Sequence, residues 1–249
     1  MGLRTFIKKK IYNLKFSKGK HSEIKNKTIL ITGASSGIGL GLCKKLVKYN
    51  KIIAIYNKNL PNLGDIENSN FISVKCDLAD MDNYQNIEKT ILDNNVELII
   101  NCAGQFGSSN QLISNIDFNN LINILKLNSL SILKILQLIY INNKMNYLKK
   151  IINLTSRAGS IELNDKGNLY VYRTSKSTLN SISKNLSVDL KKQFGISTIT
   201  IDPGNVQTGM NQKGFLSSEK CAEYLIDIIC DNKDHNGAFI NLLKKDMPW

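Results

Sequence analysis

The 249-residue chain has little histidine, proline or tryptophan, and its cysteines form no metal-binding pattern. Its two histidines, His21 and His235, lie far apart in the sequence. The five cysteines are odd in number and lack Cys-x-x-Cys spacing, which is typical of free thiols in a reducing compartment. We therefore expect no metal site and a cytoplasmic location.

The amino end also lacks an uninterrupted apolar run. In residues 1–18 the apolar side chains fall on one helical stripe, with basic side chains largely off it. This pattern does not fit a signal peptide, and Phe6 breaks the myristoylation motif. A basic amphipathic helix could make weak contact with the inner face of a membrane, or it could be a solvated extension or pack on its own subunit. We favour the second alternative, because one short helix binds lipid weakly.

The net charge of +13 is unevenly distributed. Residues 1–27 carry +8, which leaves +5 for the other 222 residues. Because the basic surplus is confined to this segment and no nucleic-acid-reading motif accompanies it, we expect no nucleic-acid partner. We interpret residues 1–27 as a basic amphipathic extension and residues 28–249 as one domain.

Short apolar runs alternate with helical stretches from residue 28 onward. We expect strands at 28–32, 51–56, 71–76, 96–101, 150–155, 197–202 and 237–243. We expect helices at 38–49, 80–94, 118–141, 170–193 and 217–231. This alternation predicts an α/β fold, a single doubly wound (Rossmann) parallel sheet of about seven strands with helices on both faces.

The stretch 118–141 is apolar on most of its faces. Lys126 and Lys134 interrupt it, so we do not expect it to span a membrane. A helix of this kind must be buried by its own domain or by another subunit. A homo-oligomer, dimer or tetramer, is therefore expected.

The sequence TGASSGIG (32–39) follows the first expected strand and begins a helix. In such a turn Gly33 permits a tight bend, Gly37 allows a phosphate to approach, and Gly39 lets the helix pack against the strand. The start of the helix then offers N–H groups and a partial positive charge to a pyrophosphate. This context predicts a dinucleotide site, although the motif alone also fits a purely structural turn.

Further motifs follow in order: CDLAD (76–80), NCAG (101–104), KLNSL (126–130), NLTSRAG (153–159), YVYRTSK (170–176) and DPGNVQT (202–208). With the G-x-x-x-G-x-G turn, they resemble the short-chain dehydrogenase/reductase family over residues 28 to about 208. The stretches around YRTSKSTLNSISKNLSVDLK, PGNVQTGM and NGAFINLLKKDMPW are most similar to the C-factor/sniffer group of carbonyl reductases.

The resemblance implies an NAD(P)-dependent oxidoreductase that acts on CH–OH or C=O groups. Tyr172 would exchange a proton with the substrate oxygen, which Ser156 would hydrogen-bond. Lys176, one helical turn from Tyr172, would favour the phenolate and bind the nicotinamide ribose, and Asn128 would hold a water in a proton relay. Tyr170 would be a neighbouring or substrate-facing aromatic residue.

The resemblance also implies a set of cofactor contacts, with Asp77 at the adenine and Thr208 at the carboxamide. The positions that match are Gly33, Ser35, Ser36, Gly37, Ile38, Gly39, Asn57, Lys58, Asp77, Leu78, Asn101, Ala103, Gly104, Tyr172, Lys176, Pro203, Gly204, Val206 and Thr208. The second strand ends in YNKN, and the next acid is Asp65. An acid there would bind the ribose hydroxyls of NAD, so NADP(H) is favoured and NAD(H) remains an alternative.

Some positions depart from the family pattern. Cys102 replaces the second Asn of NNAG, Asn205 stands where the C-factor group often has an aromatic residue, and 16 residues separate Ser156 from Tyr172. The segment 211–218 is short, which predicts a small lid and an open pocket. We expect an NADPH-dependent reductase of an aldehyde, ketone or keto-sugar. An enzyme of surface-polysaccharide or lipid synthesis, or a nucleotide-binding regulator on the same fold, are the alternatives.

Overall fold

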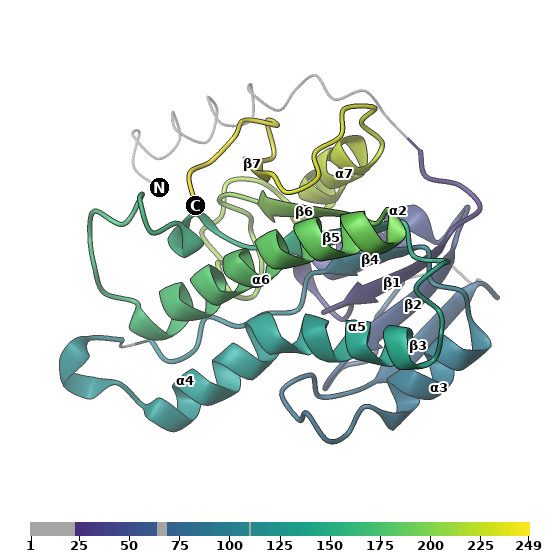
Figure 1. Ribbon diagram of the computed structural model, residues 1–249. Helices are drawn as coiled ribbons and strands as arrows, with labels where there is room; N and C mark the ends of the chain where they lie inside the picture. Colours follow the sequence, from purple (N-terminus) through teal and green to yellow (C-terminus); the bar gives the residue numbers. More distant parts are fainter. Residues whose placement is uncertain (1–22, 64–68, 110) are drawn as a thin grey trace.

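A parallel sheet of seven strands forms the middle of the molecule (Figure 1). The computed structural model describes residues 23–63, 69–109 and 111–249. The strands are β1 (Thr28–Thr32), β2 (Lys51–Tyr56), β3 (Phe71–Lys75), β4 (Leu98–Asn101), β5 (Lys150–Leu154), β6 (Ser197–Asp202) and β7 (Phe239–Asn241). They lie in the order β3-β2-β1-β4-β5-β6-β7, and every neighbouring pair is parallel. The predicted doubly wound fold is confirmed.

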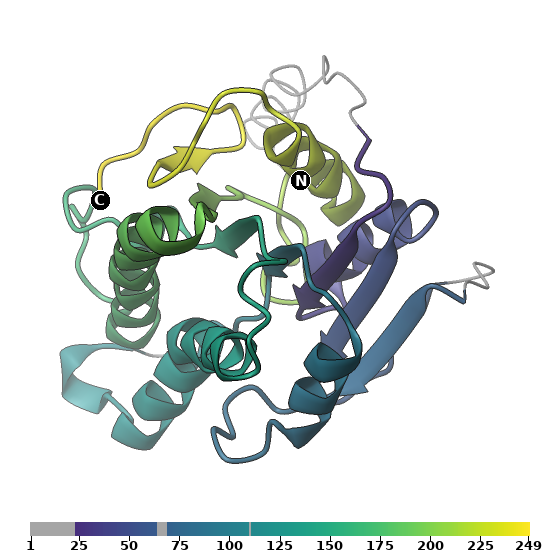
Figure 2. The ribbon, with the colours of Figure 1, turned by 45° about the vertical axis from the view of Figure 1, so that its right-hand side comes forward.

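Helices cover both faces of the sheet, as Figure 2 shows. They are α2 (Gly37–Leu46), α3 (Gln85–Asp93), α4 (Phe118–Leu125), α5 (Ser131–Ile141), α6 (Tyr170–Phe194) and α7 (Ser218–Ile229). In β1, Ile29 and Ile31 pack in the cluster that contains α2 and α7 residues, whereas Leu30 packs in the cluster that contains α3, α5 and α6 residues. Because both faces are covered, the central strands are apolar throughout rather than alternating.

The helix predicted at 118–141 is present, but its hydrogen-bonding pattern changes in the middle. A π-helical turn, Lys126–Leu130, separates α4 from α5, and the N–H of Ser131 bonds the oxygen of Lys126, five residues earlier. Such turns often occur at functional sites, and this one contains Asn128, which is fully buried. By length and composition alone, Phe118–Ile141 could cross a membrane, and half of its most apolar window is buried inside the protein.

The strand order reverses between β1 and β4, which are neighbours in the sheet but far apart in sequence. In a doubly wound sheet, the loops that leave the carboxyl ends of the strands diverge at such a point and leave a crevice for ligands. Here the loops after β1, β4, β5 and β6 meet at that edge. The predicted helix at 1–18 and its proposed membrane contact lie outside the described residues.

Candidate active site

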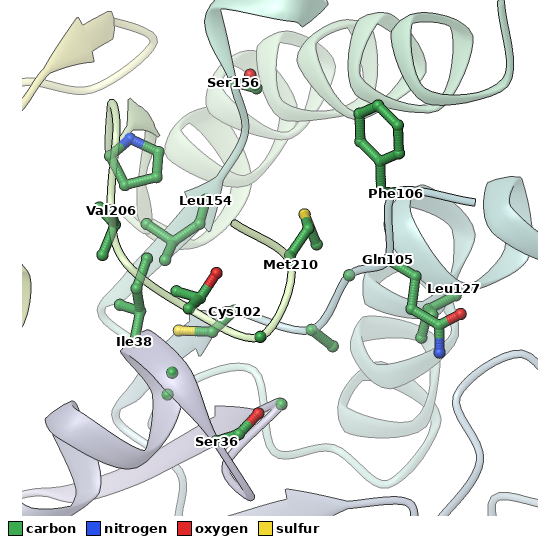
Figure 3. Close-up of a pocket in the computed structure, with 18 of the residues that line it drawn as sticks. Ser36, Ile38, Cys102, Gln105, Phe106, Leu127, Leu154, Ser156, Val206 and Met210 are labelled. Atoms are coloured by element: carbon green, nitrogen blue, oxygen red, sulfur yellow. The ribbon is translucent and has the colours of Figure 1, made fainter. Parts of the chain in front are cut away.

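A cavity of about 800 Å³ opens at the carboxyl ends of β1, β4, β5 and β6 (Figure 3). Figure 3 shows Gln105 and Phe106 on one side of it, Ile38 and Val206 on the other, and Met210 between them. Among the described residues, the only charged side chains that line it are Lys176 and Asp202. The other polar side chains that line it are uncharged hydroxyl and amide groups, such as those of Ser36, Asn57 and Thr208.

The glycine turn between β1 and α2 forms one wall. Gly33 has a φ of +66°, and a Cβ atom there would lie 2.8 Å from the Cα atom of Ala103. A Cβ atom on Gly39 would overlap the carbonyl oxygen of Gly33. Ser36, the N-cap of α2, makes no side-chain capping bond, and no acid occupies the first turn. The N–H groups at this helix start are thus available for an anion, which fits the pyrophosphate of a dinucleotide.

Thr32 joins this turn to the loop after β4. Its hydroxyl donates to Oδ1 of Asn101 at 2.8 Å and accepts the N–H groups of Cys102 and Ala103 at 3.1 and 3.0 Å. The thiol of Cys102, at the position where the family has asparagine, lines the cavity. Burial raises the pKa of this thiol well above its ordinary value, so it is a poor nucleophile at neutral pH.

The predicted serine, tyrosine and lysine come together on the opposite wall. Ser156 follows β5 and caps a short 3₁₀ turn, with its hydroxyl accepting the N–H of Ala158 at 3.1 Å. Tyr172 lies in the first turn of α6, and its phenol hydrogen-bonds Ser156. Lys176 lies one turn further, with Nζ 5.9 Å from the centre of the Tyr172 ring. These three side chains all line the cavity.

Burial dominates the ionisation of this group. Burial raises the pKa of Tyr172 to about 12, against the smaller lowering effect of the Ser156 hydrogen bond. Burial lowers the pKa of Lys176 to about 8, and nearby Cys102 and Asp202 oppose that shift. In the protein without its cofactor, desolvation of the phenol therefore dominates, and the expected stabilisation of the phenolate by Lys176 stays a prediction.

Asn128 does not line the cavity but lies behind it. Its Oδ1 accepts the N–H of Gln105 at 2.9 Å, and its Nδ2 donates to the oxygen of Gln105 and to Oγ of Ser175, both at 2.9 Å. The side chain thus ties the loop after β4 to α6. Its predicted role in a water relay stays a prediction.

Most of the predicted cofactor residues surround the cavity. Those that line it are Gly33, Ser35, Ser36, Gly37, Ile38, Gly39, Asn57, Leu78, Ala103, Gly104, Tyr172, Lys176, Pro203, Gly204, Val206 and Thr208. Lys58, Asp77 and Asn101 are not among the lining residues. The Asp77 carboxylate instead accepts the N–H of Ala79 at 3.0 Å, and Asn101 is buried beneath the loop by its bond to Thr32.

Sequence reasoning missed several lining residues, above all Phe106, Met210 and Asp202. The Phe106 ring packs against the Tyr172 ring with centroids 5.0 Å apart. Burial raises the pKa of Asp202, which accepts the N–H of Gly204 at 3.0 Å. The position of Phe106, an aromatic residue two positions after NCAG, could have predicted that it lines the cavity. Tyr170, for which we expected a neighbouring or a substrate-facing position, does not line the cavity, which leaves the neighbouring position.

Comparison with known proteins agrees with this geometry. The family model for the short chain dehydrogenase matches residues 27–218. The C-signal protein of Myxococcus xanthus is 29% identical over 156 residues, which cover 62% of this chain and 93% of that protein. The structure of carbonyl reductase Sniffer of D. melanogaster superposes with a TM-score of 0.78 at 26% identity, covering 90% of this chain and all of that one.

A third match is a solved structure whose sequence is much less similar to this chain. A short-chain dehydrogenase/reductase from Burkholderia multivorans, solved with bound NADP, has a TM-score of 0.79 at 18% identity over 90% of this chain and 100% of that one. At that identity the likeness shows the fold. The chain belongs to the short-chain dehydrogenase family, whose members are NAD(P)-dependent oxidoreductases. Within the family it is of the C-factor/sniffer type.

Proposed function

We propose that this protein reduces a carbonyl compound, an aldehyde or ketone, to an alcohol with NADPH. The observation that carries the proposal is the placement of Ser156, Tyr172 and Lys176 in one cavity with the glycine turn of α2. The carbonyl reductase Sniffer, which this chain resembles, supports the reaction type.

The preference for NADPH rests on the end of β2. Asn57 lines the cavity there, Lys58 follows it as an exposed residue, and no acid follows them along the chain before Asp65. An acid at this position would bind ribose hydroxyls and repel a 2′-phosphate, whereas neutral or basic side chains accept the phosphate. The NADP bound to the Burkholderia relative supports the same choice.

When bound, the nicotinamide would supply a hydride to the carbonyl carbon. Ser156 would donate a hydrogen bond to the carbonyl oxygen, and Tyr172 would give its phenolic proton to that oxygen as negative charge develops there. The raised pKa keeps Tyr172 protonated at neutral pH, as a proton donor requires. After transfer, the nearby ammonium of Lys176 would stabilise the phenolate until a proton returns from solvent.

The walls nearest Tyr172 indicate the kind of substrate. The Phe106 ring, 5.0 Å from the Tyr172 ring, gives an apolar surface beside the catalytic group, and Met210 and Gln105 also line the cavity. Apolar surface of this kind favours aliphatic or aromatic substituents on the carbonyl carbon. We therefore favour apolar aldehydes and ketones over keto-sugars.

The test is the loss of NADPH absorbance with a panel of aldehydes and ketones, run beside NADH and a Tyr172→Phe variant. We expect turnover that prefers NADPH and falls by at least about 1,000-fold in the variant, which keeps the ring but not the proton. A Tyr170→Phe variant is the matched control, because the Tyr170 side chain does not line the cavity. Equal loss in both variants would contradict the assignment of Tyr172.

The similarity to the C-signal protein favours a second candidate, a nucleotide-binding regulator on this fold. Such a protein would bind NADPH or NADH without needing the proton donor. The regulator would be favoured over the reductase if the protein binds a nucleotide tightly, turns over no carbonyl, and keeps the same nucleotide affinity in the Tyr172→Phe variant.

A further inference from the structure

The side chain of Gln111 lies at the junction of two segments that shape the cavity. Gln111 belongs to the segment between β4 and α4 and is only 2% exposed. Its Nε2 donates to the main-chain oxygens of Phe106 and Ser108, both at 2.8 Å. Its Oε1 accepts the N–H of Tyr172 at 2.9 Å, 61 residues along the chain. The amide is thus bonded at both ends.

The start of α6 has no capping side chain of its own. Leu169, the residue before the helix, has left-handed backbone angles (φ 55°, ψ 38°) and makes no side-chain capping bond. Gly167 and Asn168, which precede it, also have positive φ angles of 63° and 57°. N–H groups in a first helical turn need acceptors, and a leucine side chain cannot supply one. The acceptor comes instead from Gln111, whose main-chain oxygen also accepts the N–H of Tyr170 at 3.4 Å.

The two hydrogen bonds that Nε2 of Gln111 donates fix the Phe106 side of the contact between Phe106 and Tyr172. They close the loop that carries Phe106, whose ring packs 5.0 Å from the Tyr172 ring. Asn128 holds the preceding residue, Gln105, in the same way. One buried amide therefore sets both the backbone of Tyr172 and the wall against which its ring rests.

We propose that Gln111 is a positioning residue for Tyr172, capping α6 from the loop after β4 and fixing the phenol relative to a bound carbonyl. The proposal rests on the proposed function insofar as Tyr172 is the proton donor. An amide suits this place because it offers one acceptor to the helix and two donors to the loop. A small displacement of a proton donor is enough to cost one to two orders of magnitude in rate, roughly.

The test compares Gln111→Leu and Gln111→Glu with Gln193→Leu, a matched change at an exposed position near the end of α6. Hydrogen exchange of the Tyr172 amide reads the cap without any substrate, with the Leu179 amide further along α6 as internal reference. In Gln111→Leu we expect Tyr172 exchange to accelerate at least about tenfold while Leu179 is unchanged. We expect kcat to fall about 10–100-fold while the NADPH dissociation constant stays within about threefold.

Gln111→Glu adds a pH signature that a merely structural role would not produce. When protonated, the introduced carboxyl group can accept the Tyr172 N–H and donate one hydrogen bond to a loop carbonyl oxygen. When ionised it has no hydrogen to donate, and its negative charge lies against the oxygens of Phe106 and Ser108. The ratio of variant to wild-type kcat should therefore rise as pH falls. If Gln111→Leu does not fold, the pH dependence of kcat in Gln111→Glu tests the proposal by itself.

Two results would overturn the proposal: Tyr172 exchange unchanged in Gln111→Leu, or faster exchange with kcat within twofold of wild type. If wild-type protein reduces no carbonyl, the proposed function fails while the exchange result still decides whether Gln111 caps α6. Faster exchange confined to the start of α6 would then support the cap on its own.

Discussion

The ammonium of Lys176 donates a hydrogen bond to the main-chain oxygen of Leu154 at 3.0 Å, linking α6 to the end of β5. Leu154 lies two residues before Ser156, so this bond joins the segments that carry the serine and the tyrosine. Lys176 is only 4% exposed. Burial disfavours the charged form more than nearby Cys102 and Asp202 favour it, so the pKa of Lys176 falls to about 8.

Replacing Lys176 with methionine should therefore abolish activity and stabilise the fold. Between the pKa of about 8 in the folded protein and 10.5 in the unfolded chain, the unfolded chain binds more protons, so wild-type stability rises with pH across this interval. The advantage of Lys176→Met should be fully present below pH 8, at about 2 kcal/mol after allowing for the lost hydrogen bond, and should vanish above pH 10.5. Urea unfolding at several pH values measures it. Lys192→Met, at an exposed position, should show no such pH dependence.

Ser156→Ala should lower kcat about 100-fold, because it removes a hydrogen-bond donor to the substrate oxygen. It also removes the bond that lowers the pKa of Tyr172, so that pKa should rise further. Steady-state kinetics with the best carbonyl substrate tests this prediction, with Ser181→Ala on the exposed side of α6 as control. A loss confined to the nucleotide dissociation constant would contradict it.

Asn57→Asp should shift the cofactor preference from NADPH toward NADH. The new carboxylate would repel the 2′-phosphate and accept bonds from ribose hydroxyls, a change of about 10–100-fold in the ratio of dissociation constants. Fluorescence titration with both nucleotides measures the ratio. Asn185→Asp, exposed on α6, adds the same charge away from the cavity and should leave the ratio unchanged.

Trp249 holds the segment that connects Ser156 to α6. Its main-chain oxygen accepts the N–H groups of Ile161 and Glu162 at 3.1 and 3.3 Å, and its ring packs on Phe239 with centroids 5.4 Å apart. Trp249→Ala should lower the free energy of unfolding by about 1–2 kcal/mol through lost apolar burial, and should raise KM as the segment loosens. Trp249→Phe, which keeps an aromatic ring, should retain most of the wild-type free energy of unfolding and a KM close to that of the wild type. Unchanged KM in a destabilised Trp249→Ala protein would limit Trp249 to packing.

We propose that the protein is a homo-oligomer through the outer faces of α4, α5 and α6. Ile122, Leu133, Ile141 and Val188 are large apolar side chains on these helices that are 40–59% exposed. Association with a second copy would cover these apolar side chains. Light scattering should give a dimer or tetramer, and Leu133→Glu with Ile141→Glu should produce a monomer. A monomeric wild-type protein at micromolar concentration would contradict the proposal.

Sequence patterns identified those features of the molecule that depend on neighbours along the chain. The apolar runs predicted each strand of the sheet, because a buried parallel strand needs apolar side chains on both faces. The glycine spacing after β1 predicted the tight turn, because the positions of Gly33 and Gly39 leave no room for a Cβ atom. The four-residue spacing of Tyr172 and Lys176 placed both on one face of α6.

Tertiary structure decided the features that depend on residues brought together from afar. Asn128, in the π turn, bonds Gln105 and Ser175, which are distant in sequence, so an apolar pattern read along 118–141 could not reveal these contacts. The cap that Gln111 provides to Tyr172 spans 61 residues and has no local signature. Burial raises the pKa of Tyr172, and that burial depends on everything packed around the phenol, which no pattern along the chain shows. The residue types, their order and their local spacing therefore established the chemistry available, whereas the packing of distant segments set its geometry and electrostatics.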